Sequence, residues 1–282
     1  LGRLDRVRTV DPTSDTMTVE AGLTLAAARA AAEAADRLFP LSLAAEGSCE
    51  VGGNISTNAG GTQVLRFGTM RKLVLGVEAV LPDGQLYEGL AALKKDNRGY
   101  DLTQLLVAAE GTLGVVTAAS LRLVPDILDR AVGWIGVESP EAALSLLRRL
   151  ESDSGEAIES FELVPDGSLQ LVLQHIPGTR APLGGAHPWH VLVEYVRTNA
   201  AAVAPEVALE ALLARALEAG LCRDAALAAS EAQAEAFWLL RESIAPAERA
   251  RGVAVQHDIS VPVERMPEFV NAAVPAIEAA WP

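Results

Sequence analysis

The first part of the chain alternates apolar and polar residues in short stretches that predict strands. Val7 to Val10 and Met17 to Ala21 alternate in this way on either side of a polar Asp-Pro-Thr-Ser-Asp turn, which predicts a β-hairpin. Residues 74–81 and 85–88 flank Pro-Asp-Gly and predict a second hairpin, because glycine accepts the backbone conformation that such a turn needs. A later strand is expected to end at Pro125.

Helical patterns lie between these strands. An alanine-rich stretch from Leu25 to Leu38 predicts a helix that Thr24 caps and that ends before Pro40. Residues 101–107 predict a short second helix.

After Pro125-Asp126 the pattern changes to regular alternation of strands and amphipathic helices, so we place a domain boundary there, between residues 1–125 and 126–282. The expected strands are 131–137, 157–163, 189–196, 222–228 and 253–261, and the expected helices are 140–151, 168–175, 201–219, 231–250 and 264–280. This order suggests one open sheet with helices on one face. The predicted class is α+β.

The hydrophobic pattern breaks at residues 46–61, where glycine and small polar residues replace nearly every core-forming side chain. Five glycines leave backbone amides free to close around a phosphate or a flat ring. Asparagine, serine and threonine add short hydrogen-bonding side chains. A solvated turn would explain one Gly-Gly pair, but two pairs favour a ligand-binding loop. The spacing fits neither the P-loop nor the Rossmann fingerprint.

Composition and charge limit the kinds of partner and the cellular location that we expect for the protein. The net charge is −14 and the pI is about 4.8, which argues against nucleic acid as a partner. Two distant cysteines and no signal-peptide pattern fit a reducing compartment. No apolar run is long enough to span a bilayer. We therefore expect a cytoplasmic protein, with membrane contact at most peripheral.

Several motifs, in order and spacing, resemble the FAD-linked oxidase family, whose members have a FAD-binding domain of the PCMH type and a C-terminal cap domain. The N-terminal motifs are Gly-Ser-Cys…Gly-Gly-Asn-Ile-Ser-Thr-Asn-Ala-Gly-Gly at 47–61, Arg-Phe-Gly at 66–68, residues 74–84, Lys-Asp-Asn…Gly-Tyr-Asp-Leu at 95–102 and Glu-Gly-Thr-Leu-Gly-Val-Val at 110–116. The C-terminal motifs are Phe-Glu-Leu at 161–163, His-Pro-Trp at 187–189, Phe-Trp-Leu-Leu-Arg-Glu-Ser-Ile at 237–244 and His-Asp-Ile-Ser-Val-Pro at 257–262.

The resemblance implies that residues 1–125 are the second part of the FAD-binding domain and that 126–282 are an incomplete cap domain with an antiparallel sheet covered by helices. The glycine-rich segment and residues 110–116 would form two walls of the flavin site. The residues implied in FAD binding are Ser48, Gly52, Gly53, Asn54, Thr57, Asn58, Ala59, Gly60, Gly61, Gly68, Glu110, Gly111, Gly114 and Val116.

The same resemblance implies that the parent enzyme oxidises a D-2-hydroxy acid of the 2-hydroxyglutarate, lactate or glycolate class to the 2-oxo acid, with hydride transfer to flavin N5. Arg241 matches the arginine that binds the substrate carboxylate, and Gln256 and His257 lie in the expected substrate region. Ala245 replaces a hydroxyl residue and Gln256 replaces a lysine of the hydroxyglutarate pattern, which weakens the case for a dicarboxylate.

The family's catalytic histidine and metal motif would lie beyond Pro282, so we expect no catalytic residue and no metal ligand in this chain, and a divalent metal such as zinc is left open for the longer parent protein. Both ends fall inside family elements, so a truncated enzyme is the favoured reading. A flavin-binding subunit of a multi-subunit oxidase and a fragment without flavin remain alternatives. The expected partners are the hydroxy acid and an electron acceptor, either a quinone, a cytochrome or an electron-transfer flavoprotein, and a homodimer stays open.

Overall fold

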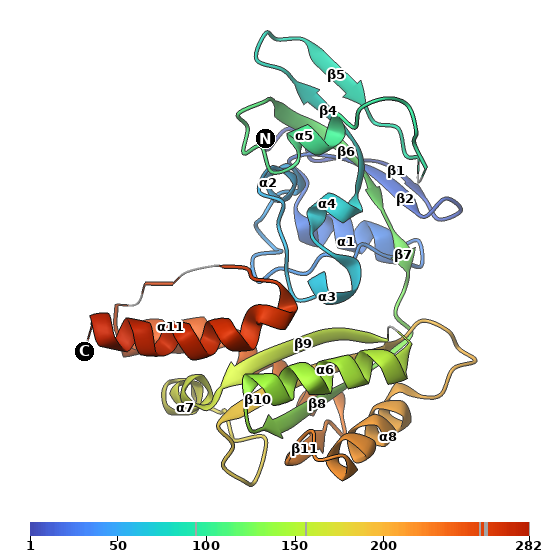
Figure 1. Ribbon diagram of the computed structural model, residues 1–282. Helices are drawn as coiled ribbons and strands as arrows, with labels where there is room; N and C mark the ends of the chain where they lie inside the picture. Colours follow the sequence, from blue (N-terminus) through green and yellow to red (C-terminus); the bar gives the residue numbers. More distant parts are fainter. Residues whose placement is uncertain (94, 156, 254, 257–258, 282) are drawn as a thin grey trace. The chain divides into compact units, whose positions relative to one another are not determined.

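The computed structural model describes residues 1–93, 95–155, 157–253, 255–256 and 259–281. The chain separates into two compact units, Leu1–Ile127 and Leu128–Pro282. Each unit combines helices with an antiparallel sheet (Figure 1), so the predicted α+β class is confirmed.

The N-terminal unit is built on a five-stranded sheet in the order β1-β2-β6-β4-β5. These strands are β1 (Val7–Asp11), β2 (Thr16–Glu20), β4 (Val74–Val80), β5 (Leu86–Gly89) and β6 (Val115–Arg122), and a separate pair joins β3 (Arg37–Leu38) to β7 (Val124–Pro125). The helices are α1 (Leu25–Glu33), α2 (Val51–Ser56), α3 (Val64–Phe67), α4 (Met70–Leu73) and α5 (Thr103–Leu106). Both predicted hairpins, β1-β2 and β4-β5, are confirmed.

One face of this sheet carries the core. Val19 of β2 and Leu121 of β6 are fully buried there with Ala28 and Ala32 of α1, which matches the alternation in the strands and the alanine face of the helix. Thr24 caps α1 as predicted, since its Oγ1 accepts a hydrogen bond from the Ala27 amide at 3.3 Å.

The helix α1 ends at Glu33 and not at Leu38, so the predicted length is wrong. Asp36 takes a positive φ of 54°. Arg37 then pairs with Pro125 in a short ladder, and its Nε donates to Asp15 at 2.8 Å. These tertiary contacts outweigh the helix propensity of the alanine-rich stretch.

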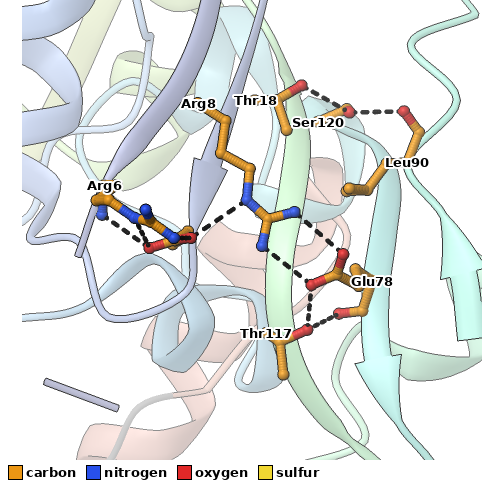
Figure 2. Close-up of polar contacts among 8 residues, drawn as sticks. Arg6, Arg8, Thr18, Glu78, Leu90, Thr117 and Ser120 are labelled. Atoms are coloured by element: carbon orange, nitrogen blue, oxygen red, sulfur yellow. Dashed lines mark hydrogen bonds and ion pairs between the residues drawn. The ribbon is translucent and has the colours of Figure 1, made fainter. Parts of the chain in front are cut away.

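The opposite face of the sheet carries a network of charged and hydroxyl side chains (Figure 2). Arg8 donates from Nε to Glu20 at 3.3 Å and from Nη1 and Nη2 to Glu78 at 3.0 and 3.1 Å. Glu20 is 1% exposed. Its pKa is lowered to about 2, and the largest cause is the side-chain hydrogen bonding from Arg6. Thr117 donates to Glu78 at 2.7 Å. The network ties β1, β2, β6 and β4 together across the sheet.

The C-terminal unit contains a four-stranded antiparallel sheet in the order β11-β8-β10-β9. Its strands are β8 (Asp129–Val137), β9 (Ile158–Pro165), β10 (Trp189–Arg197) and β11 (Asp224–Leu227). Its helices are α6 (Pro140–Ser154), α7 (Asp166–His175), α8 (Pro205–Glu218), α9 (Glu231–Glu242), α10 (Ile244–Arg251) and α11 (Met266–Ala280), with the short 3₁₀ helix η1 (Val263–Arg265).

Helices cover both faces of this sheet, which corrects the expectation of helices on one face. Ile135 of β8 packs with Leu146 of α6 in one core, on the face where Figure 1 shows α6 lying along the strands. Trp134, on the other face of β8, packs with Val172 of α7 and Leu240 of α9 in a second core. Strands that are apolar on both faces need such double cover.

The predicted helix 231–250 is two helices, α9 and α10, which meet at Ser243. Pro246 explains the break, because a proline has no N–H for the helical hydrogen bond and its ring clashes with the carbonyl four residues earlier, at Glu242.

The predicted strand 253–261 is wrong for the residues of this stretch that the structure describes. Val253, Val255 and Ile259 are exposed and lie outside any strand. Their alternation satisfied a strand pattern, but β propensity is expressed only where a partner strand and a packing surface exist.

Candidate functional site

The glycine-rich segment is partly helical, which corrects the expectation of a continuous loop. Residues 51–56 form α2, and Gly52 lies so close to β2 that an added Cβ would come within 2.7 Å of the Ala21 Cβ. A Cβ on Gly61 would lie 1.7 Å from the Ser42 carbonyl oxygen. Of the described residues 46–61, Asn58 takes a positive φ, 52°, and the glycines do not. These glycines therefore permit close packing more than they permit unusual dihedral angles.

The small polar side chains of the segment mostly bond within it. Ser48 donates to the Ala45 carbonyl at 3.3 Å, and Thr57 donates to the Gly53 carbonyl at 3.0 Å. Asn54 is 5% exposed and its amide contacts the Cys49 sulfur at 3.5 Å. Since these donors have partners, the groups that the segment offers to a ligand are mainly on its backbone.

The second predicted wall lies directly beside the first. The amides of Ala108 and Glu110 donate to the carbonyls of Ile55 at 3.1 Å and Ser56 at 3.0 Å. Ala108, Glu110 and Gly111 have φ values of 67°, 48° and 78°. Left-handed conformation costs a non-glycine residue about 1–2 kcal/mol, so the fold holds this turn against local preference, as is common at functional sites.

Arg71, which the sequence did not single out, joins the two segments. Its amide donates to the Asn58 Oδ1 at 2.9 Å. Its Nη1 donates to the backbone and side-chain oxygens of Gln104, both at 2.9 Å, and its Nη2 donates to the Val107 carbonyl at 2.9 Å. A planar guanidinium suits this task because its donors form a fixed fork. No pattern in the sequence pairs Arg71 with Gln104, which is 33 residues away, so its role follows from these bonds.

The residues of the two segments fit a dinucleotide cofactor with an anionic pyrophosphate. Residues 46–61 and 110–116 contain no lysine, arginine or histidine. Among the described residues of these segments, many amides already donate to carbonyls of the chain, but those of Gly60, Gly61 and Gly111 make no backbone hydrogen bond, so an anion held there would meet N–H groups at these glycines. At Gly53 and Gly111 the position of an added Cβ is open, with no atom within 4 Å apart from the chain neighbours and the local helix backbone. A flat ring or a phosphate can therefore approach the backbone at both glycines.

Other residues implied in FAD binding hold the segments in place. Ala59 donates to the Asn54 carbonyl at 2.8 Å and accepts from the Met70 amide at 2.8 Å. Gly60 packs on Val64, and Gly68 ends α3 with a φ of 79°. A Cβ added to Gly114 would lie 3.0 Å from the Val80 carbonyl oxygen. Val116 is part of the core. These are packing positions in the described unit.

In the C-terminal unit, Arg241 near the end of α9 is paired with Glu162 of β9. The Arg241 Nε donates to the Glu162 Oε2 at 2.8 Å, and Nη2 lies 2.7 Å from the same oxygen. Phe237, one turn earlier, packs on the Trp134 ring, so the helix is anchored to the sheet. The sequence predicted Arg241 but gave Glu162 no role.

Gln256 is exposed and donates to the Glu248 Oε2 at 2.7 Å. It is not brought next to Arg241 by any described contact. His257 lies outside the described residues.

A buried carboxylate lies on the same sheet face as Glu162. Glu194 of β10 is 3% exposed and accepts from the Arg130 Nη1 at 2.9 Å. Burial raises its pKa to about 7, and nearby Glu159 adds to the effect, whereas Arg130 and a hydrogen bond from Trp238 oppose it.

We predict that Glu194 makes the C-terminal unit less stable as the pH rises. Because the folded pKa is about 7 and the ordinary value is 4.5, the folded state binds the proton more tightly, and stability falls as the pH increases from 4.5 to about 7. The loss should be about 3 kcal/mol. Glu194→Gln should remove most of this slope in urea unfolding followed by tryptophan fluorescence, which reports this unit because all four tryptophans lie in it. Exposed Glu210→Gln is the control, and an unchanged slope in Glu194→Gln would contradict the prediction.

Two histidines of this unit, His187 and His190, lie next to acidic side chains. His190 is 2% exposed and its Nδ1 accepts from the Trp134 Nε1 at 3.1 Å, while its Nε2 lies 3.2 Å from Asp166. The His187 Nε2 lies 3.6 Å from Asp224.

In the part of the chain that is described, no group of three or more His, Cys, Asp or Glu side chains is arranged to hold a metal ion. The helices found in that part are also too short or too polar to cross a membrane.

Comparison with known proteins agrees with this geometry. Residues 1–89 match the family described as "FAD binding domain", and residues 129–280 match "FAD linked oxidases, C-terminal domain". The chain is 35% identical over 271 residues to D-2-hydroxyglutarate dehydrogenase, mitochondrial, of Arabidopsis thaliana, covering 96% of this chain and 48% of that protein. It is 39% identical over 235 residues to the protein of the same name from Rattus norvegicus, covering 83% and 43%. The fold resembles a solved alkyldihydroxyacetonephosphate synthase, with a TM-score of 0.69 at 15% identity over 100% of this chain and 56% of that one.

The chain belongs to the FAD-linked oxidases, because the C-terminal family match alone covers more than half of it. The predicted family and its cofactor, FAD, are thereby confirmed. The chain spans about half the length of the curated relatives it matches.

The expectation of a cytoplasmic protein is wrong in the light of these relatives, whose names place them in mitochondria. An acidic surface and few cysteines report charge and thiol use, and neither property specifies an organelle.

Proposed function

We propose that the protein containing this chain uses FAD to oxidise a D-2-hydroxy acid to the corresponding 2-oxo acid. Family membership and relatives named as D-2-hydroxyglutarate dehydrogenases support this proposal. The observation that carries it is the direct bonding of residues 55–56 to residues 108–110, which brings together the two segments that the resemblance assigns to the cofactor.

The N-terminal unit holds the cofactor mainly through backbone. Gly53 and Gly111 offer open backbone for close approach, and Asn58 and Arg71 keep the two segments together. When bound there, FAD would supply the acceptor for the hydride that leaves the substrate α-carbon.

In the C-terminal unit, Arg241 binds the substrate carboxylate and so fixes the orientation of the α-carbon. A guanidinium matches a carboxylate with two parallel hydrogen bonds. Gln256 is uncharged and bonds to Glu248, so it offers no cation to a second carboxylate. Lactate and glycolate therefore stand beside 2-hydroxyglutarate as substrate candidates.

The oxidation releases two electrons, which must pass to an acceptor before the next turnover. A quinone, a cytochrome or an electron-transfer flavoprotein would serve, and a homodimer is compatible with the proposal.

The test is product formation by the purified full-length protein with FAD and an artificial electron acceptor. D-2-hydroxyglutarate, D-lactate and glycolate are supplied separately, with the L-enantiomers of the first two as controls. We expect one molecule of 2-oxo acid for each two-electron reduction of the acceptor, from glycolate or from a D-enantiomer only. No 2-oxo acid from any of these substrates would contradict the proposal.

A further inference from the structure

The Glu162–Arg241 pair has an asymmetric geometry. A single carboxylate oxygen, Oε2 of Glu162, accepts both contacts, from Nε at 2.8 Å and from Nη2 at 2.7 Å. Both donors lie on one edge of the guanidinium plane. The side chains are 36% and 22% exposed, so the pair lies at the border of the packed region.

This contact leaves the other edge of the guanidinium available. Arginine has five N–H donors in a rigid plane, and the edge formed by the two terminal nitrogens can bind a second carboxylate with two parallel bonds. Within the part of the chain that the structure describes, Nη1 of Arg241 makes no hydrogen bond.

Glu162 stands on a rigid support. It pairs in register with Leu192 of β10, a strand that has neighbours on both sides in the sheet. Arg241 comes from a helix whose Leu240 is 4% exposed in the core beneath. A bond between the sheet and the helix therefore fixes the guanidinium plane of a long side chain that can otherwise adopt many rotamers.

We propose that Glu162 is a positioning residue, which holds Arg241 by one edge of its guanidinium so that the other edge receives the carboxylate of the substrate. This inference rests on the proposed function, in which Arg241 binds that carboxylate. It adds a residue that acts on the substrate through Arg241.

A purely structural ion pair would behave differently. A partly exposed ion pair contributes little to stability. If the Glu162–Arg241 pair had only that role, its loss would leave turnover unchanged. Loss of a positioning carboxylate frees the guanidinium to move and also removes a negative charge beside it. Binding of a simple anion should then stay as tight or become tighter, while the reacting geometry deteriorates.

The experiment compares wild type, Glu162→Gln, Glu162→Asp and the control Glu138→Gln in the full-length protein with FAD. Glu138 forms an exposed pair with the Arg223 Nε at 2.9 Å in the same unit, so it matches the charge change away from Arg241. The first measurement is kcat with D-lactate, D-2-hydroxyglutarate or glycolate, whichever is oxidised fastest. The second is the Kd of the matching acid without the hydroxyl, which is propanoate, glutarate or acetate.

We expect Glu162→Gln to lower kcat about ten-fold or more without weakening the Kd of the inert acid, because small misplacements of a bound substrate are costly. Glu162→Asp keeps the charge but has a shorter side chain, so its kcat should lie between those of wild type and Glu162→Gln. The kcat of Glu138→Gln should match that of wild type. A kcat of Glu162→Gln within two-fold of an active wild type would overturn the inference and leave the proposed function intact. A wild type that oxidises none of the three acids would overturn both.

Discussion

Replacing Arg241 with methionine is expected to raise the KM for the D-2-hydroxy acid about 10- to 100-fold, since a hydrogen-bonded charged group is worth about 1.5–3 kcal/mol. Methionine keeps much of the volume of the side chain and removes the donors that bind Glu162 and, in the proposed function, the substrate carboxylate. The FAD content should stay unchanged, because the residues that fit the cofactor belong to the other unit.

Arg223→Met provides the matched control, since Arg223 makes an exposed ion pair with Glu138 in the same unit. Steady-state kinetics and the FAD-to-protein ratio decide the outcome. If Arg241→Met and Arg223→Met had the same KM as wild type, Arg241 would not bind the substrate.

Arg71→Lys is expected to weaken FAD binding and to loosen the segment that contains Ala108. Lysine keeps the charge but cannot reproduce the fork that bonds to Gln104 and Val107. Oxygens left without donors cost about 1–3 kcal/mol each, so we expect roughly 3 kcal/mol less local stability.

Hydrogen exchange at the amides of Ala108 and Glu110 measures this effect, because both amides donate to carbonyls of α2. Exchange there should become faster, and the Kd for FAD should rise, while Arg122→Met, at an exposed position of β6, should change neither. Unchanged exchange and unchanged FAD binding in Arg71→Lys would contradict the role given to Arg71.

The sequence contained enough information for the hairpins and most of the C-terminal helices. Alternation around Pro-Asp-Gly at 82–84 predicted β4 and β5, and Gly84 does take a positive φ of 83°. The motif order also identified the family, because glycine spacing and the Glu-Gly-Thr-Leu-Gly segment are specific in combination.

Contacts between residues that are far apart in the sequence could not be predicted from local patterns. The early end of α1 depends on the bond from Arg37 to Asp15, and the role of Gly52 depends on its distance from Ala21. Pro246 was a local signal for the break between α9 and α10 that the alanine-rich pattern obscured. Local propensity describes one stretch at a time, whereas these features belong to pairs of stretches.

The residues of the candidate site also fall into those that the sequence predicted and those that only the structure revealed. The sequence predicted both cofactor segments and Arg241, whereas Arg71 and Glu162 emerged only from their bonds to those residues. Arg71 belongs to none of the motifs, and Glu162 lies in the Phe-Glu-Leu motif at 161–163, which does not indicate its bond to Arg241. Their positions become meaningful once the partner is known.

The central claim is tested most directly by the absorbance of the purified full-length protein with FAD, followed without oxygen as a D-2-hydroxy acid is added. We predict that the flavin bands bleach with D-2-hydroxyglutarate, D-lactate or glycolate and remain with the L-enantiomers of the first two. Bands that persist with glycolate and with every D-2-hydroxy acid, or a colourless protein that does not take up FAD, would contradict it.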